Sequence, residues 1–188
     1  MNLKLEAWYF LHDRRKFWSD MLRPLHLLNF ERSQYYKDCV KYYSDLYVKG
    51  RIVFDIGSDF GTSPMFFLQK GAKLVLGFSL DKQYFVKPGY VHYRCRDEIE
   101  VARLANNLRN TYITMHDLEN KVSLKMDCEG CEWDFSPEFL ESFADWVIAL
   151  HSPVKNKRLY EYITRNGRFI GQENDEEFAV YKKKEVLE

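Results

Sequence analysis

The spacing of apolar side chains divides the chain into an N-terminal helical part and a longer part in which strands alternate with helices. In residues 1–48 the apolar positions recur every three, four or seven residues, which predicts helices. Pro24 is expected to end or kink the first of them. A second helix is predicted over residues 33–48. Its apolar stripe would consist of Tyr36, Val40, Tyr43 and Tyr47, with Gly50 just beyond its end.

From residue 51 the apolar runs become short, which is typical of strands buried on both faces of a parallel sheet. We predict strands at 51–56, 73–80, 90–95, 122–127 and 146–150. Helices are predicted at 63–72, 97–110, 136–143 and 155–167, the first with Ser63 as N-cap and Pro64 as its first helical residue. The segments 169–172 and 177–183 resemble a closing antiparallel pair.

This alternation predicts a doubly wound α/β sheet, mostly parallel, with a C-terminal antiparallel pair. Residues 1–49 are interpreted as a helical extension packed on the main domain, and residues 50–188 as that domain. In such sheets, ligands bind at the carboxyl ends of the strands.

The amino-acid composition limits the kinds of binding partner that we expect for the protein. The 28 Lys and Arg balance the 28 Asp and Glu, so net charge does not favour nucleic acid or an anionic membrane. The basic and aromatic segment 12–18 is better interpreted as a solvated helix face than as a nucleic-acid contact. Neither a signal peptide nor a membrane span is predicted. Because the sequence has four Cys and no predicted export signal, we expect a cytoplasmic protein with mostly reduced thiols. Oligomeric state cannot be inferred.

The turn after the first predicted strand has the pattern D-x-G-x-x-x-G, from Asp55 to Gly61. It lacks the Gly-Lys-Ser/Thr ending of a P-loop. It also differs from a dinucleotide fingerprint, because Asp59 occupies the position where the backbone would approach a pyrophosphate. Acids around a glycine turn suit a cationic ligand without phosphate, such as S-adenosylmethionine. A glycine-containing turn in an α/β protein of any function remains the alternative.

A second motif, "KMDCEGCE" at residues 125–132, follows "TMHDLEN" at residues 114–120. With "DIGSDFG" and "GFSLD", these segments resemble the FkbM-like S-adenosylmethionine-dependent methyltransferases over roughly residues 51–151. The resemblance implies a Rossmann-like methyltransferase sheet, with S-adenosylmethionine as cofactor. The matched residues of the second motif are Lys125, Asp127, Glu129, Gly130 and Glu132.

The resemblance also assigns roles to individual residues. The loop containing Asp55, Gly57, Ser58, Asp59 and Gly61 would hold the methionine part of the cofactor. Asp127 and Glu129 would line the acceptor side.

Two departures from the family concern the cofactor site. Ser79 stands where the family has the acid that binds the ribose, and Asp81 is a nearby substitute on the same face. The connection after the second strand is short. The wall of the pocket for the cofactor's adenine is therefore expected to consist of Tyr84 and Phe85, or of the helix start at Asp97 and Glu98.

His151 follows the strand at 146–150, and it should emerge at the same edge as Asp55 and Asp127. It is a candidate general base for a hydroxyl acceptor, the alternative being a structural histidine. The pair Cys128 and Cys131 could serve redox chemistry or bind a metal. We favour small buried residues at a strand end, and we predict no metal site.

The sequence thus predicts an enzyme, an S-adenosylmethionine-dependent O-methyltransferase acting on a small-molecule or sugar-like acceptor. The catalytic candidates are Asp127, Glu129 and His151. The alternative is a non-catalytic Rossmann-like module that has lost the cofactor and acts through protein or nucleic-acid contacts. Ser79 and the short connection that follows it favour this alternative.

Overall fold

The computed structural model describes residue 31 and residues 34–58, 61–80, 87–116, 121–173 and 178–184. The first predicted helix with its break at Pro24 lies outside the described residues. So do Asp59, Asp81 and the pair Tyr84 and Phe85.

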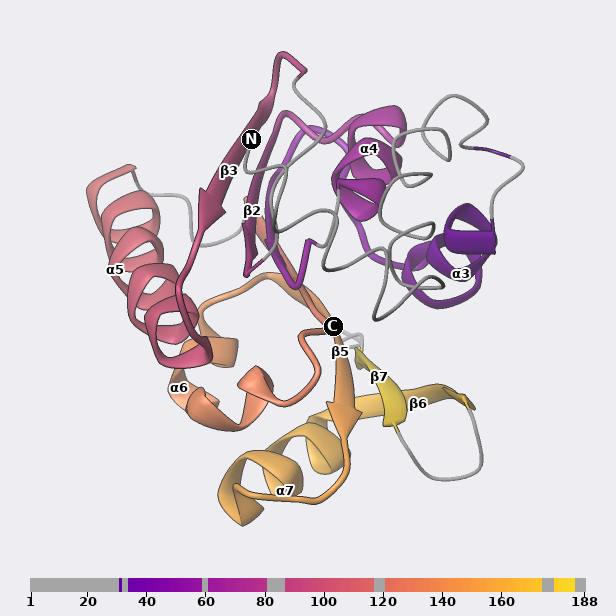
Figure 1. Ribbon diagram of the computed structural model, residues 1–188, viewed down its shortest axis with the longest axis vertical. Coiled ribbons are helices and arrows are strands. Elements are labelled where there is room, and N and C mark those ends of the chain that lie inside the picture. Colours follow the sequence, from indigo (N-terminus) through magenta and orange to yellow (C-terminus); the bar gives the residue numbers. More distant parts are fainter. Residues whose placement is uncertain are drawn as a thin grey trace, which may run out of the picture.

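Seven strands form one sheet in the order β3-β2-β1-β4-β5-β7-β6 (Figure 1). The five strands from β3 to β5 in this order are parallel, whereas β7 runs antiparallel to both β5 and β6. The predicted mostly parallel sheet with a C-terminal antiparallel pair is therefore confirmed. The strands are β1 (Ile52–Ile56), β2 (Leu74–Ser79), β3 (Tyr90–Arg94), β4 (Val122–Met126), β5 (Asp145–His151), β6 (Gly167–Glu173) and β7 (Phe178–Lys183).

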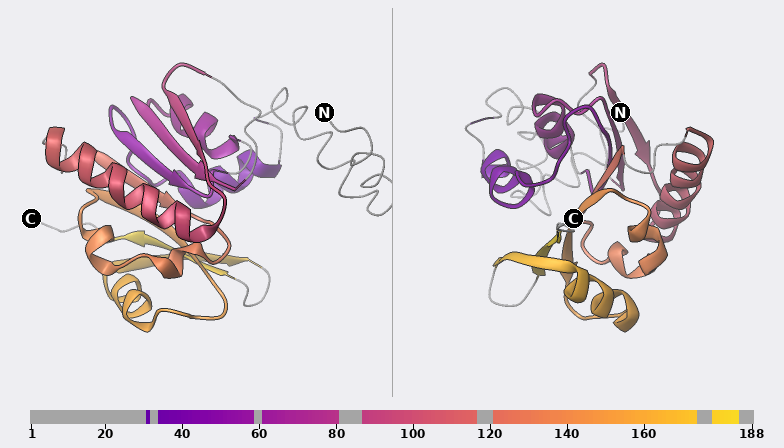
Figure 2. Two further views of the ribbon diagram at one scale, coloured as in Figure 1. Left: turned by 60° about the vertical axis from the view of Figure 1, so that its left-hand side comes forward. Right: turned by 180° about the vertical axis from the view of Figure 1, so that it is seen from behind.

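Helices cover both faces of the sheet (Figures 1 and 2). On one face lie α5, α6 and α7 with the short 3₁₀ helix η2, and on the other lie α3 and α4. Their bounds are α3 (Gln34–Tyr43), α4 (Thr62–Gln69), α5 (Glu98–His116), η2 (Cys131–Asp134), α6 (Pro137–Glu141) and α7 (Lys157–Asn166).

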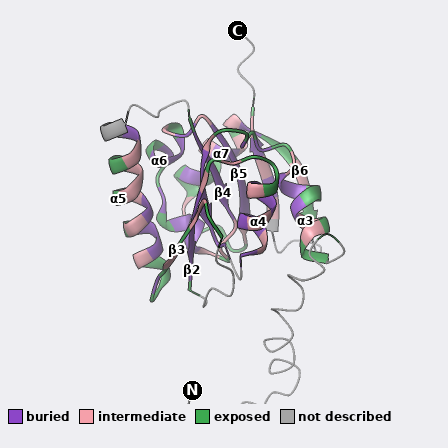
Figure 3. Cartoon of the chain, turned by 90° about the horizontal axis from the view of Figure 1, so that it is seen from above, coloured by how far each residue is buried: buried purple, intermediate pink, exposed green. Residues whose placement is uncertain are grey.

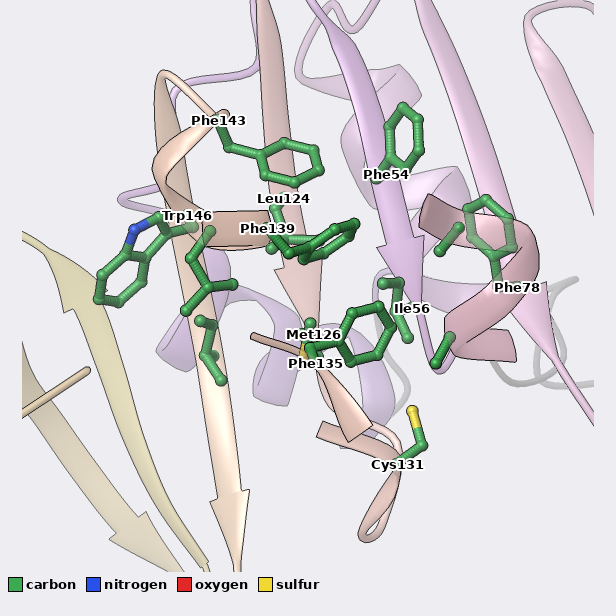
Figure 4. Packing of buried hydrophobic residues seen from close by; sticks show 14 of the residues in the cluster. Phe54, Ile56, Phe78, Leu124, Met126, Cys131, Phe135, Phe139, Phe143 and Trp146 are labelled. Carbon is green, nitrogen blue, oxygen red and sulfur yellow. The ribbon is translucent and has the colours of Figure 1, made fainter. Parts of the chain in front are cut away.

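The strands alternate their side chains between two apolar cores. In β1, Phe54 and Ile56 pack toward α5 and α6, among the aromatic residues drawn in Figure 4. Val53 points the other way, toward α3 and α4. All five residues of β1 and all five of β4 are buried, as Figure 3 shows for the centre of the molecule. This is the burial expected of central strands in a parallel sheet.

Two local predictions were wrong. Helix α3 ends at Tyr43, so Tyr47 lies beyond it, and both Val40 and Tyr47 are exposed. The buried side of the helix contains Cys39, Tyr42 and Tyr43, so that Cys39 takes the place predicted for Val40.

In α4 the N-cap residue is Gly61, at φ 97°. Ser63 lies in the first turn, where its hydroxyl donates a hydrogen bond to Asp55 Oδ2 at 2.7 Å. The side chain predicted to cap the helix therefore binds a neighbouring strand.

A buried ion pair joins the two central strands. Asp55 of β1 stands directly opposite Lys125 of β4, and the two side chains lie on the face covered by α3 and α4. Lys125 Nζ lies 3.2 Å from Asp55 Oδ1, and the side chains are 2% and 0% exposed. Burial raises the pKa of Asp55, while the Lys125 charge and the Ser63 hydroxyl act to lower it. The pair depends on mutual compensation, because neither charge is solvated.

The same strands approach closely where they end. Lys125 Nζ also donates a hydrogen bond to the carbonyl oxygen of Gly57 at 2.5 Å. A Cβ atom added to Gly57 would lie 1.7 Å from the carbonyl oxygen of Asp127, and φ of Gly57 is +79°. Glycine is therefore required here by the neighbouring backbone. The ion pair and this contact bring the ends of β1 and β4 together.

We predict that removing one member of the ion pair is costly and that removing both is less so. Lys125→Met should lower the free energy of unfolding by about 3–5 kcal/mol, because it leaves the Asp55 carboxylate without its cation. The double variant Asp55→Asn/Lys125→Met should lose clearly less than the sum of the two single changes. Chemical denaturation of the four proteins measures this.

The matched control is Lys157→Met. Lys157 is exposed and lies 3.8 Å from Glu161, so its replacement should change stability by no more than about 0.5 kcal/mol. If the losses in unfolding free energy of Asp55→Asn and Lys125→Met simply add in the double variant, that result would contradict the pairing of the two side chains.

Candidate active site

A pocket of about 390 Å³ lies at the carboxyl edge of the parallel strands, beside the ends of β1 and β4. The helix that follows β1 covers one face of the sheet, whereas the helices that follow β4 cover the other. This is the point in a doubly wound sheet where a crevice opens for a ligand. Its volume is in the range of small-molecule sites.

The pocket brings together many of the predicted site residues. The lining includes Gly57, Ser79, Asp127, Glu129 and His151, together with Glu98 at the start of α5. All three catalytic candidates therefore lie in one cavity with Gly57 and Ser79 of the predicted cofactor site, and Glu98, one of the residues expected beside the adenine, lines the same cavity.

Other predicted cofactor residues lie behind the lining. Asp55 and Ser58 are completely buried, and neither belongs to the residues that line the pocket. Asp55 binds Lys125 and Ser63, and the Ser58 hydroxyl faces Gly77 of β2. Gly61 caps α4. These positions indicate that the three residues shape the turn, and that the pocket is formed by their neighbours.

A buried carboxylate fixes His151. Glu132 is 0% exposed, and its Oε1 accepts a hydrogen bond from the backbone N–H of His151 at 2.8 Å. The same oxygen lies 3.1 Å from His151 Nδ1, while Oε2 accepts a bond from the Gly130 N–H at 2.9 Å. Because a carboxylate can only accept, Nδ1 must carry a proton. In neutral His151 the other nitrogen, Nε2, then has the free lone pair.

The second ring nitrogen faces another carboxylate. His151 Nε2 lies 3.5 Å from Asp127 Oδ1, and the two side chains are 16% and 26% exposed. Burial lowers the pKa of His151, but Glu132, Asp127 and Glu129 together outweigh burial, so that the pKa lies above its ordinary value. A proton on Nε2 is therefore favoured by the carboxylate of Asp127 beside it.

The turn between Asp127 and Glu132 has an unusual backbone. Glu129 has φ +54° and Gly130 φ +123°. Non-glycine residues with positive φ are uncommon, and they cluster at functional sites. Here the turn places the Asp127 and Glu129 side chains in the pocket and directs Glu132 beneath His151.

The same turn closes a disulfide between Cys128 and Cys131, whose Cα atoms are 5.5 Å apart. The prediction of reduced thiols was wrong for this pair, because the left-handed residues between them fold the chain to within bonding reach. Cys39 and Cys95 are buried and do not take part in this disulfide. Within the described ranges, no three His, Cys, Asp or Glu side chains are grouped to hold a metal ion.

Ser79 lies at the end of β2, where the resemblance expects an acid. It is 6% exposed, and its Oγ lies 3.0 Å from Nε2 of His92 on β3. The hydroxyl therefore belongs to a hydrogen-bonded pair across two strands while its residue lines the pocket.

The contribution of α3 to the pocket was not predicted from the sequence. One face of this helix lines the pocket, and its residues are Tyr35, Asp38, Cys39, Tyr42 and Tyr43. Their spacing of three, four, seven and eight is a helical-face signal. The pattern was visible in the sequence, but it does not say which surface the face will cover. The hydroxyl of Tyr43 donates a hydrogen bond to Asp127 Oδ2.

None of the helices in the described ranges is both long and apolar enough to cross a membrane. No family model matches the chain.

Among solved structures, the chain is similar to a Streptococcus thermophilus protein named "Putative hemolysin". The TM-score is 0.49 and the identity 13%, over 79% of this chain and 64% of the other. It is also similar to Sp1610 from Streptococcus pneumoniae in complex with S-adenosyl-L-methionine, with TM-score 0.42 and 11% identity over 74% and 69% of the chains. Similarity at this level carries no information on function.

Two viral proteins are similar in sequence. Uncharacterized protein 65 of Sulfolobus islandicus filamentous virus (isolate Iceland/Hveragerdi) is 22% identical over 143 residues, which cover 71% of this chain and 86% of that protein. Uncharacterized protein 158B of Sulfolobus islandicus rod-shaped virus 1 is 30% identical over 128 residues, covering 65% of this chain and 75% of that protein. The chain belongs to the same protein family as this protein 158B.

Proposed function

We propose that the protein is an S-adenosylmethionine-dependent methyltransferase that methylates a hydroxyl group of a small acceptor. The observation that carries this proposal is the placement of His151. Its Nδ1 is held by the buried Glu132, and its Nε2 faces Asp127 in a pocket beside the glycine turn of β1. A histidine so oriented is suited to accept the proton of a bound hydroxyl.

The residues of the pocket fit the cofactor. S-adenosylmethionine has an ammonium and a sulfonium group, and the carboxylates of Asp38, Glu98, Asp127 and Glu129 lie in the lining. The first turn of α4, at Thr62, offers backbone N–H groups for the cofactor's carboxylate. When bound, this cofactor supplies a methyl group activated for attack by a nucleophile. Gly57, Thr62, Ser79 and Glu98 are the residues proposed to hold it.

His151 would act on the acceptor. Neutral His151 carries its proton on Nδ1, so Nε2 could take the proton of an acceptor hydroxyl and make its oxygen a better nucleophile. The resulting imidazolium would be stabilised by Glu132 and Asp127, the carboxylates that raise its pKa. Asp127 and Glu129 would also orient the acceptor, because both lie in the lining beside His151.

The charge of the pocket bears on the class of acceptor. Lys125 is neutralised by Asp55, which leaves a lining dominated by carboxylates. An acceptor with phosphate groups would be repelled by such a surface. We therefore propose a small hydroxyl-bearing acceptor without phosphate, of which a sugar-like molecule is one kind.

The motif at residues 125–132 supports the more specific proposal that the enzyme is FkbM-like, because each residue that matches the family has a structural or site role here. Lys125 bonds the turn at Gly57, Asp127 and Glu129 line the pocket, and Glu132 orients His151. Gly130 adopts the positive φ that the turn requires.

One observation favours the non-catalytic alternative. The side chain of Ser79 cannot accept hydrogen bonds from both ribose hydroxyl groups as a carboxylate would. Its Oγ also already lies 3.0 Å from Nε2 of His92. Cofactor binding therefore decides between the two functions.

Calorimetry with S-adenosylmethionine and S-adenosylhomocysteine tests the proposal directly. We expect both to bind, and a ligand at about 100 times its dissociation constant should stabilise the fold by about 2.7 kcal/mol. Adenosine triphosphate is the control ligand, and it should not bind because its phosphates meet carboxylates. Neither heat nor a thermal shift with millimolar cofactor would leave the non-catalytic module as the better account.

Ser79→Glu tests the assignment of the ribose site. The introduced carboxylate restores an acceptor for two hydroxyls, so the affinity for S-adenosylhomocysteine should rise, by about ten-fold for one charged hydrogen bond of about 1.5 kcal/mol. Thr111→Glu on the exposed side of α5 adds the same charge away from the pocket, and should leave affinity unchanged. A strong loss of binding in a folded Ser79→Glu protein would show that the pocket is built around the serine.

The raised pKa of His151 predicts a pH dependence of stability. Because protonated His151 is favoured in the folded state, its stabilising contribution is complete below the ordinary pKa of 6.5 and is lost as pH rises through the folded pKa. His151→Gln should remove this slope from the free energy of unfolding, and Glu132→Gln should lower the pKa of His151 in an NMR titration. An unchanged pH profile in His151→Gln would exclude the raised pKa.

A further inference from the structure

Tyr43 connects α3 to the residues around His151. It is 7% exposed, and its ring packs against Phe67 of α4, with centroids 6.3 Å apart. Its hydroxyl donates a hydrogen bond to Asp127 Oδ2, across 84 positions of sequence. A residue from the part of the chain that lies outside the family resemblance therefore contacts a catalytic candidate.

The hydrogen bond from Tyr43 determines the orientation of the Asp127 carboxylate. Asp127 is 26% exposed, so its carboxylate is not fixed by burial alone. With Oδ2 held by Tyr43, the other oxygen, Oδ1, faces His151 Nε2 at 3.5 Å. The result is a chain of polar contacts from Tyr43 through Asp127 and His151 to the buried Glu132.

We propose that Tyr43 is a positioning residue of the acceptor site, which holds Asp127 so that Oδ1 and His151 Nε2 bracket the hydroxyl to be methylated. The inference rests on the proposed function for its catalytic meaning. It makes α3 a wall of the site, because Tyr35, Asp38 and Tyr42 line the pocket on the same helical face. The acceptor would then lie between α3 and the ends of β4 and β5.

A purely structural role for Tyr43 is the competing interpretation, since its ring belongs to the core beneath α3 and α4. The two roles differ in what the hydroxyl does. If Tyr43 only packs, its loss changes stability alone. If it positions Asp127, its loss changes the electrostatic surroundings of His151, whose charged neighbours are Glu132, Asp127 and Glu129.

The test is an NMR titration of His151 in the ligand-free protein and in three variants. Tyr43→Phe keeps the ring and should shift the pKa of His151 upward, because the Asp127 carboxylate is no longer neutralised in part by a donor and can approach Nε2. Asp127→Asn should shift it downward. Because Tyr43 acts through Asp127, the double variant should match Asp127→Asn alone.

Tyr42→Phe is the matched control, because Tyr42 is a buried neighbour on α3 whose hydroxyl contacts Lys41. It should leave the His151 titration unchanged. Equal titrations in wild type and Tyr43→Phe, or additive shifts in the double variant, would overturn the proposal.

Two further measurements keep the outcome clear. If Tyr43→Phe does not fold, the ring resonances of Tyr43 in Asp127→Asn give the same information, since they should move while those of Tyr42 do not. Binding of S-adenosylhomocysteine is measured on wild type and on each folded variant, and Tyr43→Phe should retain it. Absent binding in every protein would defeat the proposed function, whereas normal binding with uncoupled titrations would defeat only the role of Tyr43.

Discussion

The ion pair between Asp55 and Lys125 is the interaction on which the site depends. Two charges that are buried between the central strands and α4 must compensate each other, since their side chains are only 2% and 0% exposed. Their geometry fixes three segments at once. Lys125 binds the carbonyl of Gly57, Ser63 binds Asp55, and the backbone of Asp127 passes within contact of Gly57. The glycine turn, the start of α4 and the end of β4 therefore meet at one place, and the pocket lies above it.

Above this base, acids that are close in sequence have different surroundings and different tasks. Glu132 is fully buried and holds the His151 ring, whereas Asp127 is partly exposed and faces its other nitrogen. Between them the left-handed backbone of Glu129 and Gly130 turns the chain, and a disulfide closes the turn. The segment 125–132 thus provides both an acid that lines the pocket, Asp127, and a buried acid that holds His151, Glu132. The two roles differ because the two side chains differ in burial.

Sequence patterns predicted the succession of strands and α-helices along the described chain from residue 51 onward, and the edge at which Asp127 and His151 meet. Such features follow from local periodicity and from the geometry of parallel sheets. The pairing of Asp55 with Lys125 requires the register of β1 and β4, which no local pattern specifies. The disulfide depends on the φ angles of Glu129 and Gly130, and the position of Tyr43 on the docking of α3. These are properties of tertiary structure, and they include most of what gives the site its chemistry.

The most direct measurement of the central claim, that this pocket is a cofactor site, is amide chemical-shift mapping with S-adenosylhomocysteine. The account predicts saturable shifts at Gly57, Thr62, Ser79 and Glu98, which surround the proposed cofactor position. Residues in the cleft between α6 and α7, such as Glu138 and Tyr162, should not move. Shifts confined to that second cleft, or no shifts with millimolar ligand, would contradict the claim.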